Sequence, residues 1–293
     1  METVNQEVLH IFNNLLAIHN DNFLNGVVGE ERIHLLENHV RDVFQGICTD
    51  EEQLFQPNLS QFPMKIQKAI QLYAGSGFTK VNDFLRQHQG YVKNTGEKLR
   101  DLNLATFETE NYELDGVIDS LDFIIDKYRS DSDFVFFRGC SLEQFQNLGI
   151  SSLEELETSV GKSFVEHSFL STSSSLGGQF TVASPVVLAI HVPAGSHFLP
   201  MDSLLALKGE KEVLLERETM LSIGGAEKIG DQYFVYMRSS SLEKQIVNHI
   251  RDIHLTDQDE SLQLSPAYDD DYESSLSDML DEEENFVDSS FRK

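Results

Sequence analysis

The sequence predicts an α+β protein, in which an N-terminal helical lobe is followed by a β-rich half. Up to residue 130, apolar residues recur at the three- and four-residue spacing of amphipathic helices. Beyond that point, short apolar runs alternate with turns rich in Gly, Ser and Pro. We expect residues 1–130 and 131–255 to form one domain, and the acidic residues 256–293 to form a disordered tail.

Five segments of the lobe carry the spacing of a helix. Pro63 suits the first position of the third helix, because its missing N–H would have no intrahelical partner there. Gly75-Ser76-Gly77 interrupts the pattern before the fourth helix, whose residues Phe78, Val81, Phe84 and Leu85 are expected to point inward. The five predicted helices cover residues 4–18, 31–47, 63–72, the segment after residue 77, and 115–128.

The β-rich half contains five predicted strands, bounded by Gly, Ser and Pro. A final helix over residues 240–254 is indicated by Leu242, Ile246, Ile250 and Ile253 on one face. The predicted strands cover residues 134–137, 163–170, 186–192, 213–215 and 233–237.

Composition excludes several classes of function. The net charge of −27 disfavours nucleic-acid binding, because phosphate contacts need Lys and Arg. No apolar run has the length of a membrane span, and the N-terminus lacks the features of a signal peptide, so a cytosolic fold is expected. The two cysteines, Cys48 and Cys140, have no metal-ligand spacing, so neither a structural zinc site nor a disulfide framework is expected.

Three polar signals occur in order within the β half. Arg138-Gly139 ends an aromatic strand, Ser171-Thr172-Ser173 ends a second strand, and Glu210-Lys211-Glu212 precedes an aliphatic run. Taken alone, the arginine is typical of a surface cation, the Ser-Thr-Ser run of a turn, and the glutamate pair of a solvated face. If residues 210–212 are extended, the two carboxylates project to the same side.

In this order and spacing, the three signals resemble the Arg–Ser-Thr-Ser–Glu-x-Glu signature of the arginine-specific, toxin-like mono-ADP-ribosyltransferases. A second segment, Tyr73-x-Gly75-x-x-Phe78-x-x-Val81-Asn82-x-x-Leu85-Arg86, is similar to a helical segment of that family. It departs at Phe78 and Val81, where the family has Tyr and Ile. The resemblance spans residues 60–240 and implies a split β-sandwich that binds NAD as substrate, without a metal.

The resemblance implies roles for the strongest matches. Cleavage of the nicotinamide–ribose bond passes through an oxocarbenium-like state, which a carboxylate stabilises, and the match assigns this role to Glu212. Arg138 would bind phosphate oxygens of NAD, and Gly139 would approach the nicotinamide amide. Ser171 would donate a hydrogen bond to Glu212. Glu210 would recognise and deprotonate an acceptor arginine, whereas a Gln there would suit other acceptors.

Weaker matches complete the predicted site. Thr172 and Ser173 would shape the pocket, and Phe180, in the loop 174–183, would either stack on NAD or enter the core. Residues 201–209 would form a target-recognition loop or a short packed helix. Tyr73 and Asn82 match positions near the NAD pocket, although a purely structural role is also open.

The resemblance predicts transfer of ADP-ribose from NAD to an arginine of a target protein. Two alternatives remain open: an NAD glycohydrolase, and a catalytically idle NAD- or protein-binding module of the same fold. In the tail, Glu282-Glu283-Glu284 followed by Phe291 resembles the C-terminal signal of type IV secreted bacterial effectors. The alternative setting is a phage-encoded transferase acting in the bacterial cytoplasm, and the tail itself could simply be a solvating acidic segment.

Overall fold

The structure, a computed structural model, describes residues 2–18, 23–24, 26–46, 54–92, 96–99, 112–177, 181, 183–202 and 211–241. The tail 256–293 and residues 242–254 lie outside the described residues, and so does the predicted domain boundary at 255. Within the described part of the chain, no helix is long and apolar enough to cross a membrane.

The five predicted helices of the lobe are confirmed, with ends shifted by a few residues. α3 and α4 are joined by the π turn Tyr73–Gly77, in which Gly75 has non-helical φ and ψ angles of −78° and −111°. The Gly-Ser-Gly segment therefore kinks the chain. Phe78 is 49% exposed, so the prediction that it points inward is wrong; it begins α4 at the kink, whereas Val81 and Leu85 lie in the core. The helices are α1 (Glu2–Ile18), α2 (Gly29–Val43), α3 (Met64–Leu72), α4 (Phe78–Gln87) and α5 (Leu114–Asp126).

Eight strands pair in the order β4-β9-β10-β6-β3-β5-β8-β7, and β1 with β2 forms a separate two-stranded sheet. β10 pairs parallel with β6, and every other neighbour pair is antiparallel. β3 and β5 share a single residue pair, Phe137 with Ser173, so the sheet divides there. The strands are β1 (Lys98–Leu99), β2 (Tyr112–Glu113), β3 (Phe134–Cys140), β4 (Ser163–Glu166), β5 (Leu170–Ser173), β6 (Val186–Val192), β7 (Phe198–Pro200), β8 (Glu212–Leu215), β9 (Thr219–Ile229) and β10 (Gln232–Ser241).

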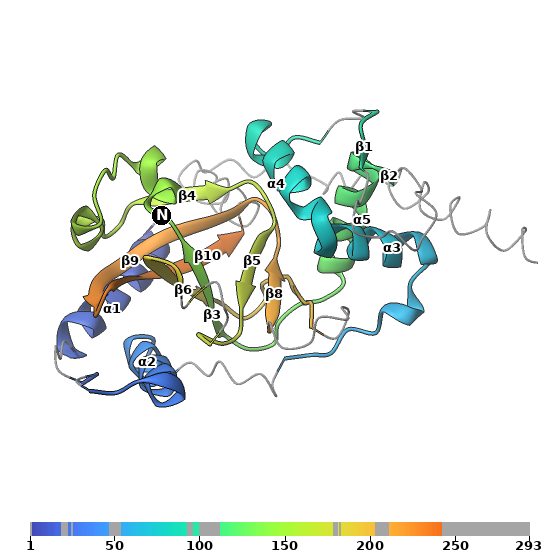
Figure 1. The fold of residues 1–293 in the computed structure, drawn as a ribbon. Coiled ribbons are helices and arrows are strands. Elements are labelled where there is room, and N and C mark those ends of the chain that lie inside the picture. Colours follow the sequence, from blue (N-terminus) through green and yellow to red (C-terminus); the bar gives the residue numbers. More distant parts are fainter. Residues whose placement is uncertain are drawn as a thin grey trace, which may run out of the picture. The chain divides into compact units, whose positions relative to one another are not determined.

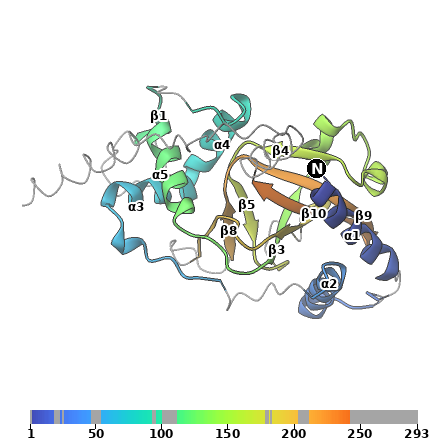
Figure 2. The same cartoon turned by 180° about the vertical axis from the view of Figure 1, so that it is seen from behind.

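The division creates two leaves: a first leaf of β4, β9, β10, β6 and β3, and a second leaf of β5, β8 and β7. Apolar residues of both leaves, such as Phe136, Leu188 and Leu170, share one core cluster, so the leaves pack face to face. The outer face of the first leaf packs against α1 and α2. The outer face of the second leaf packs against α3, α4 and α5, as the two opposite views show (Figures 1 and 2). The predicted split β-sandwich is confirmed.

β6 shows why a continuous apolar run marks the centre of the first leaf. Leu188 and Ile190 point into the cluster between the leaves, and Val187 and Ala189 point toward α1 and α2. Because both faces of the strand are covered, alternation between polar and apolar residues is lost.

One strand prediction within the β half is wrong, and one long strand was missed. The run 163–170 is not one strand: it divides into β4, which pairs with β9, and β5, which pairs with β3 and β8. β9 was also not predicted, because Gly224-Gly225 at its centre has the composition of a turn. In the structure, Gly225 pairs with Tyr236 and Ile223 with Met237, so Gly224 occupies a β-bulge.

The glycine pair lets α1 approach β9. A Cβ at Gly224 would lie 2.8 Å from Cγ2 of Ile11, and a Cβ at Gly225 would lie 2.7 Å from Cδ2 of Leu15. Ile11 is branched at Cβ and sits directly over the bulge, so it has little freedom to move away.

We expect Gly224→Ala to lower the free energy of unfolding by about 1–3 kcal/mol, because the added methyl overpacks the contact with Ile11. Urea unfolding measures the change. Gly116→Ala is the matched control: nothing lies within 4 Å of its added Cβ in α5, so no loss of stability is expected. Equal stability of Gly224→Ala and the wild type would contradict this packing.

Candidate active site

Two neighbouring strands of the second leaf bring Ser171 and Glu212 together. Oγ of Ser171 donates a hydrogen bond to Oε1 of Glu212 across 2.6 Å, as the sequence predicted. In the register of β5 and β8, Ser171 lies opposite Leu214 and Ser173 opposite Glu212, so these four residues share one face. Leu214 on this face packs in the cluster of α3, α4 and α5, so the carboxylate faces the helical side of the second leaf.

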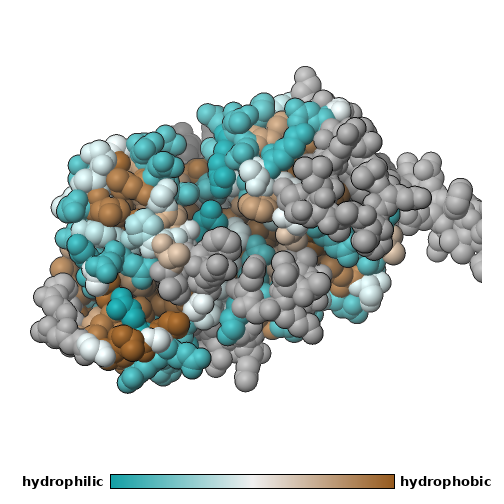
Figure 3. Space-filling view, in the orientation of Figure 1, coloured by the Kyte–Doolittle hydropathy of each residue, from teal (hydrophilic) through white to brown (hydrophobic). Residues whose placement is uncertain are grey.

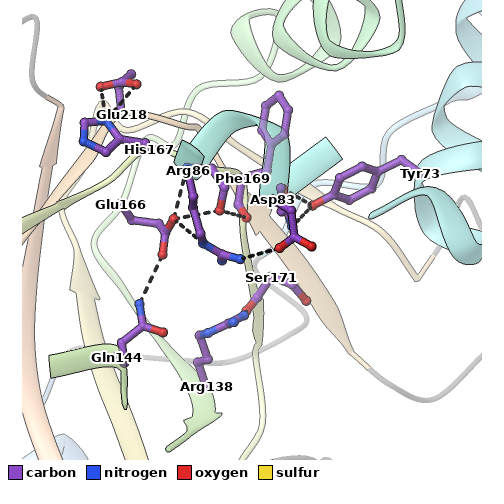
Figure 4. A network of polar contacts seen from close by, with 12 residues as sticks. Tyr73, Asp83, Arg86, Arg138, Gln144, Glu166, His167, Phe169, Ser171 and Glu218 are labelled. Carbon is purple, nitrogen blue, oxygen red and sulfur yellow. Dashed lines mark hydrogen bonds and ion pairs between the residues drawn. The ribbon is translucent and has the colours of Figure 1, made fainter. Parts of the chain in front are cut away.

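Arg138 lies at the end of β3, where the sheet divides. Its Nη1 donates a hydrogen bond of 2.6 Å to the backbone oxygen of Ser171, which joins the two leaves near their single residue pair (Figure 4). Its Nε is buried and has no hydrogen-bond partner among the described residues. Burial lowers the pKa of Arg138 and the nearby Glu166 opposes this shift, but a guanidinium remains charged at any physiological pH.

The other predicted residues of the two strands have defined places. Thr172 is buried, and its Oγ1 donates to the backbone oxygen of Val213 across 2.7 Å. Oγ of Ser173 accepts a hydrogen bond from the backbone N–H of Ser175 at 3.2 Å. Gly139 pairs with Val187 within the ladder of β3 and β6.

The backbone before Glu212 is not extended. β8 begins at Glu212, and Lys211 has a φ of +52°, in the left-handed region that a non-glycine residue rarely adopts. The strand alternation assumed for residues 210–212 therefore does not hold. Glu210 and Phe180 lie outside the described residues, as do residues 203–209 of the predicted recognition loop.

Tyr73 and Asn82 form a buried pair between α3 and α4. Nδ2 of Asn82 lies 3.1 Å from the hydroxyl oxygen of Tyr73, whose ring meets Phe169 edge-on. Burial raises the pKa of Tyr73, the hydrogen bond with Asn82 opposes this, and the charge of Glu212 raises it further. The pair thus packs the core while lying within the electrostatic reach of Glu212.

Sequence reasoning missed a polar network beside Arg138, centred on Glu166 at the end of β4. Its carboxylate accepts hydrogen bonds from Nε of Arg86 at 3.1 Å, from Nε2 of Gln144 at 3.1 Å, and from N and Oγ of Ser168 at 3.1 and 2.7 Å (Figure 4). Arg86 is the last residue of the segment that resembles the family's helical segment, so the resemblance pointed to this arginine. No sequence pattern pointed to Glu166, because its partners lie up to 80 residues away.

A second polar contact joins the helices to the turn between β8 and β9. Nε of Arg217 lies 3.0 and 2.9 Å from the two carboxylate oxygens of Asp122 in α5, and its Nη1 donates to the backbone oxygen of Gly90 at 2.7 Å. This contact holds α5 beside the end of β8, the strand that carries Glu212, whereas Arg86–Glu166 holds α4 beside the end of β4.

The described residues include no group of three or more His, Cys, Asp or Glu side chains that could hold a metal ion. The arrangement instead offers a charged guanidinium and an oriented carboxylate at the division of a sandwich. Such groups suit a substrate that carries phosphate and develops positive charge.

Comparison with protein families agrees with this chemistry. The model of the ADP-ribosyltransferase exoenzyme family matches residues 52–252. The chain belongs to this family. It is therefore a toxin-like, NAD-dependent mono-ADP-ribosyltransferase, and the matched range contains Arg138, Ser171 and Glu212.

Solved structures with similar folds include members from several bacteria. Plx2a, an ADP-ribosyltransferase toxin from Paenibacillus larvae, is 21% identical with a TM-score of 0.47, and the match covers 62% of this chain and 89% of Plx2a. The Clostridium limosum C3 exoenzyme is 18% identical with a TM-score of 0.49, covering 65% and 90%. C3stau2 from S. aureus, solved with NAD, is 16% identical with a TM-score of 0.49, covering 62% and 89%. No curated protein sequence matches the chain.

The Glu166 network makes the stability of this transferase depend on pH. Burial by itself would raise the pKa of Glu166, but Arg86 and the hydrogen bonds from Ser168 outweigh it and hold the pKa below its ordinary value of 4.5. As the pH falls below that value, the unfolded chain takes up the proton before the folded chain does. The free energy of unfolding therefore falls as the pH drops through this range, and the full contribution is present above it.

We expect Glu166→Gln to reduce the free energy of unfolding at pH 7 by about 1–3 kcal/mol, because the buried charge-assisted bonds are lost. Between about pH 5 and pH 3 the variant should lose less stability than the wild type, since residue 166 no longer titrates. Denaturant unfolding over this range measures both, with the exposed Glu143→Gln as control. If the free energy of unfolding falls with pH in parallel for Glu166→Gln and the wild type, Glu166 is not the group that makes stability depend on pH.

Proposed function

We propose that this transferase moves the ADP-ribose of NAD onto an arginine side chain of a target protein and releases nicotinamide. The observation that carries the proposal is the 2.6 Å hydrogen bond from Ser171 to Glu212, beside the partly buried guanidinium of Arg138. The bond fixes the Glu212 carboxylate in one orientation. The Arg138 guanidinium, bonded to the backbone of Ser171, supplies a fixed positive charge beside β5.

In the first half of the reaction, the bond between ribose C1′ and the nicotinamide nitrogen breaks, and its electron pair leaves with neutral nicotinamide. Positive charge develops on the ribose, and the carboxylate of Glu212 stabilises it while accepting a hydrogen bond from a ribose hydroxyl. Ser171 holds that carboxylate. Arg138 binds phosphate oxygens through guanidinium donors that its bond to Ser171 leaves available.

In the second half, a guanidinium nitrogen of the acceptor forms the new bond to C1′ and loses a proton. An arginine has a pKa above about 12, so it is a poor nucleophile until a base takes up that proton. We assign this role to Glu210. The left-handed backbone at Lys211 turns the chain between the two glutamates, which suits separate roles for them.

The remaining assignments extend the same site. Gly139 would lie against the nicotinamide amide, Thr172 and Ser173 would shape the pocket, and Phe180 would stack on NAD. The buried pair of Tyr73 and Asn82 would form the helical wall.

The family and the tail support a proposal for the biological setting. A toxin-like transferase whose tail carries Glu282-Glu283-Glu284 followed by Phe291 suits an effector delivered into a host cell, and we propose that setting. A phage-encoded enzyme acting on bacterial proteins is the alternative. The protein partner in either case is a target with a reactive arginine.

Incubation with NAD labelled in its ADP-ribose moiety, with and without host-cell lysate, tests the proposal. The wild type should label a protein band, and Glu212→Ala should lower the labelling at least about a thousandfold, as loss of a transition-state contact does. The exposed Glu143→Ala serves as control and should retain full labelling. Free ADP-ribose without a labelled protein would indicate a glycohydrolase, and no cleavage of NAD at all would overturn both enzymatic functions.

In the same assay, Glu210→Gln separates the two halves. It should abolish labelling of arginine while keeping measurable release of nicotinamide, because the substitution removes the base and leaves Ser171 and Glu212 intact. Mapping the modified residue by mass spectrometry identifies the acceptor. Equal loss of labelling and nicotinamide release, or label on a residue other than arginine, would contradict the role given to Glu210.

A further inference from the structure

α1 and α2 lie outside residues 52–252, the range that matches the family, yet they are part of the same packed body. They contribute Ile11, Leu36 and Val40 to a core cluster with β3, β6 and β10. Figure 3 shows apolar surface in the region of the view where α1 and α2 lie. The side chains of Leu9 and Leu16 in α1 are exposed. The two helices therefore add a layer to the first leaf beyond the matched domain.

A buried polar contact fixes α2 on that leaf. Nε2 of His39 lies 2.6 Å from Oε1 of Glu227 in β9, and the same oxygen accepts a hydrogen bond from the hydroxyl of Tyr236 at 2.6 Å. All three side chains are buried, and Phe23 stacks on the ring of His39 with 4.7 Å between centroids. This contact fixes the backbone of α2, which also carries the side chain at position 37.

Glu37 is that side chain, and it contacts the turn that follows the Ser-Thr-Ser strand. Its Oε1 accepts hydrogen bonds from Oγ of Ser175 at 3.1 Å and from the backbone N–H of Leu176 at 3.0 Å. The two partners are 138 and 139 residues away in sequence. A carboxylate that accepts from a backbone N–H and a hydroxyl makes stronger bonds than a neutral acceptor would.

The same turn is bonded to the residue before Glu212. The backbone N–H of Ser174 donates to the carbonyl oxygen of Lys211 at 2.9 Å, and the N–H of Ser175 donates to Oγ of Ser173 at 3.2 Å. The turn 174–177 thus lies between Glu37 on one side and Lys211 on the other. Because Lys211 has a strained left-handed backbone, its carbonyl oxygen needs a fixed donor to keep that conformation.

We propose that Glu37 is a positioning residue for the NAD site. By fixing the turn 174–177 it keeps Ser174 bonded to Lys211, and thereby keeps Glu212 and the end of β5 in the geometry that binds NAD. The inference rests on the proposed function of that site. Without Glu37 the turn samples other conformations, and the apparent affinity for NAD falls by the fraction of molecules that remain competent.

The test measures two properties of Glu37→Ala, Glu37→Gln and the wild type. The first is hydrogen exchange at the amide of Leu176, which does not depend on activity. The second is KM and kcat for NAD cleavage. We expect Glu37→Ala to exchange faster at Leu176 and to raise KM about tenfold with a smaller change in kcat, since only the population of the binding geometry changes.

Glu37→Gln should reverse most of both changes, because its amide oxygen still accepts the two hydrogen bonds, although more weakly than a carboxylate does. Glu31→Ala, an exposed glutamate in the first turn of the same helix, is the matched control and should behave as the wild type. Thermal unfolding of each variant shows whether the fold is retained.

The outcomes separate this inference from the proposed function. Faster exchange at Leu176 with an unchanged KM would overturn the positioning role while leaving the function of the site intact. Unchanged exchange would overturn the contact itself. If Glu37→Ala raises KM tenfold and Glu37→Gln raises it as much, the positioning role is also overturned, because the effect would then not depend on an acceptor oxygen. A wild type that cleaves no NAD would overturn the proposed function and this role together.

Discussion

The site depends on the hydrogen bond between the guanidinium of Arg138 and the backbone oxygen of Ser171. β3 and β5 share one residue pair, so a side chain rather than a backbone ladder joins the two leaves beyond that pair. The side chain that joins the leaves also places a permanent positive charge at the division.

The partly buried cation of Arg138 lies beside a network that contains a compensating negative charge. Glu166 lies close enough to oppose the loss of solvation of Arg138, and four donors from Arg86, Gln144 and Ser168 in turn satisfy Glu166. Removal of one partner would leave an uncompensated buried charge, which costs more than the pair itself contributes. The network therefore determines the position of α4 relative to the strands as well as the electrostatics of the site.

Much of the site could be predicted because its chemistry restricts residue type and spacing. An arginine at a strand end, a Ser-Thr-Ser strand and a Glu-x-Glu pair occur in an order that few other arrangements require. The bond between Ser171 and Glu212 followed directly from that match. The arrangement of Glu210 did not follow, since the strand alternation assumed across Lys211 is interrupted by its left-handed backbone.

Contacts between distant elements could not be predicted from periodicity. Gly224-Gly225 has the composition of a turn. The reason for glycine at these strand positions is the close approach of Ile11 and Leu15 of α1, which the sequence does not reveal. Glu37 resembles any other polar residue on the outside of a helix until Ser175 and Leu176 are placed beside it. In each case the deciding partner lies more than a hundred residues away.

The central claim is that Arg138, Ser171 and Glu212 form a single NAD site where the two leaves divide. A crystal structure of Glu212→Gln with NAD tests it most directly, because the substitution preserves the shape of the side chain and removes the charge used in turnover. We expect a phosphate oxygen of NAD within hydrogen-bond distance of the Arg138 guanidinium, and a hydroxyl of the nicotinamide ribose within hydrogen-bond distance of the side chain of residue 212. NAD bound elsewhere on the protein, out of contact with both residues, would contradict it.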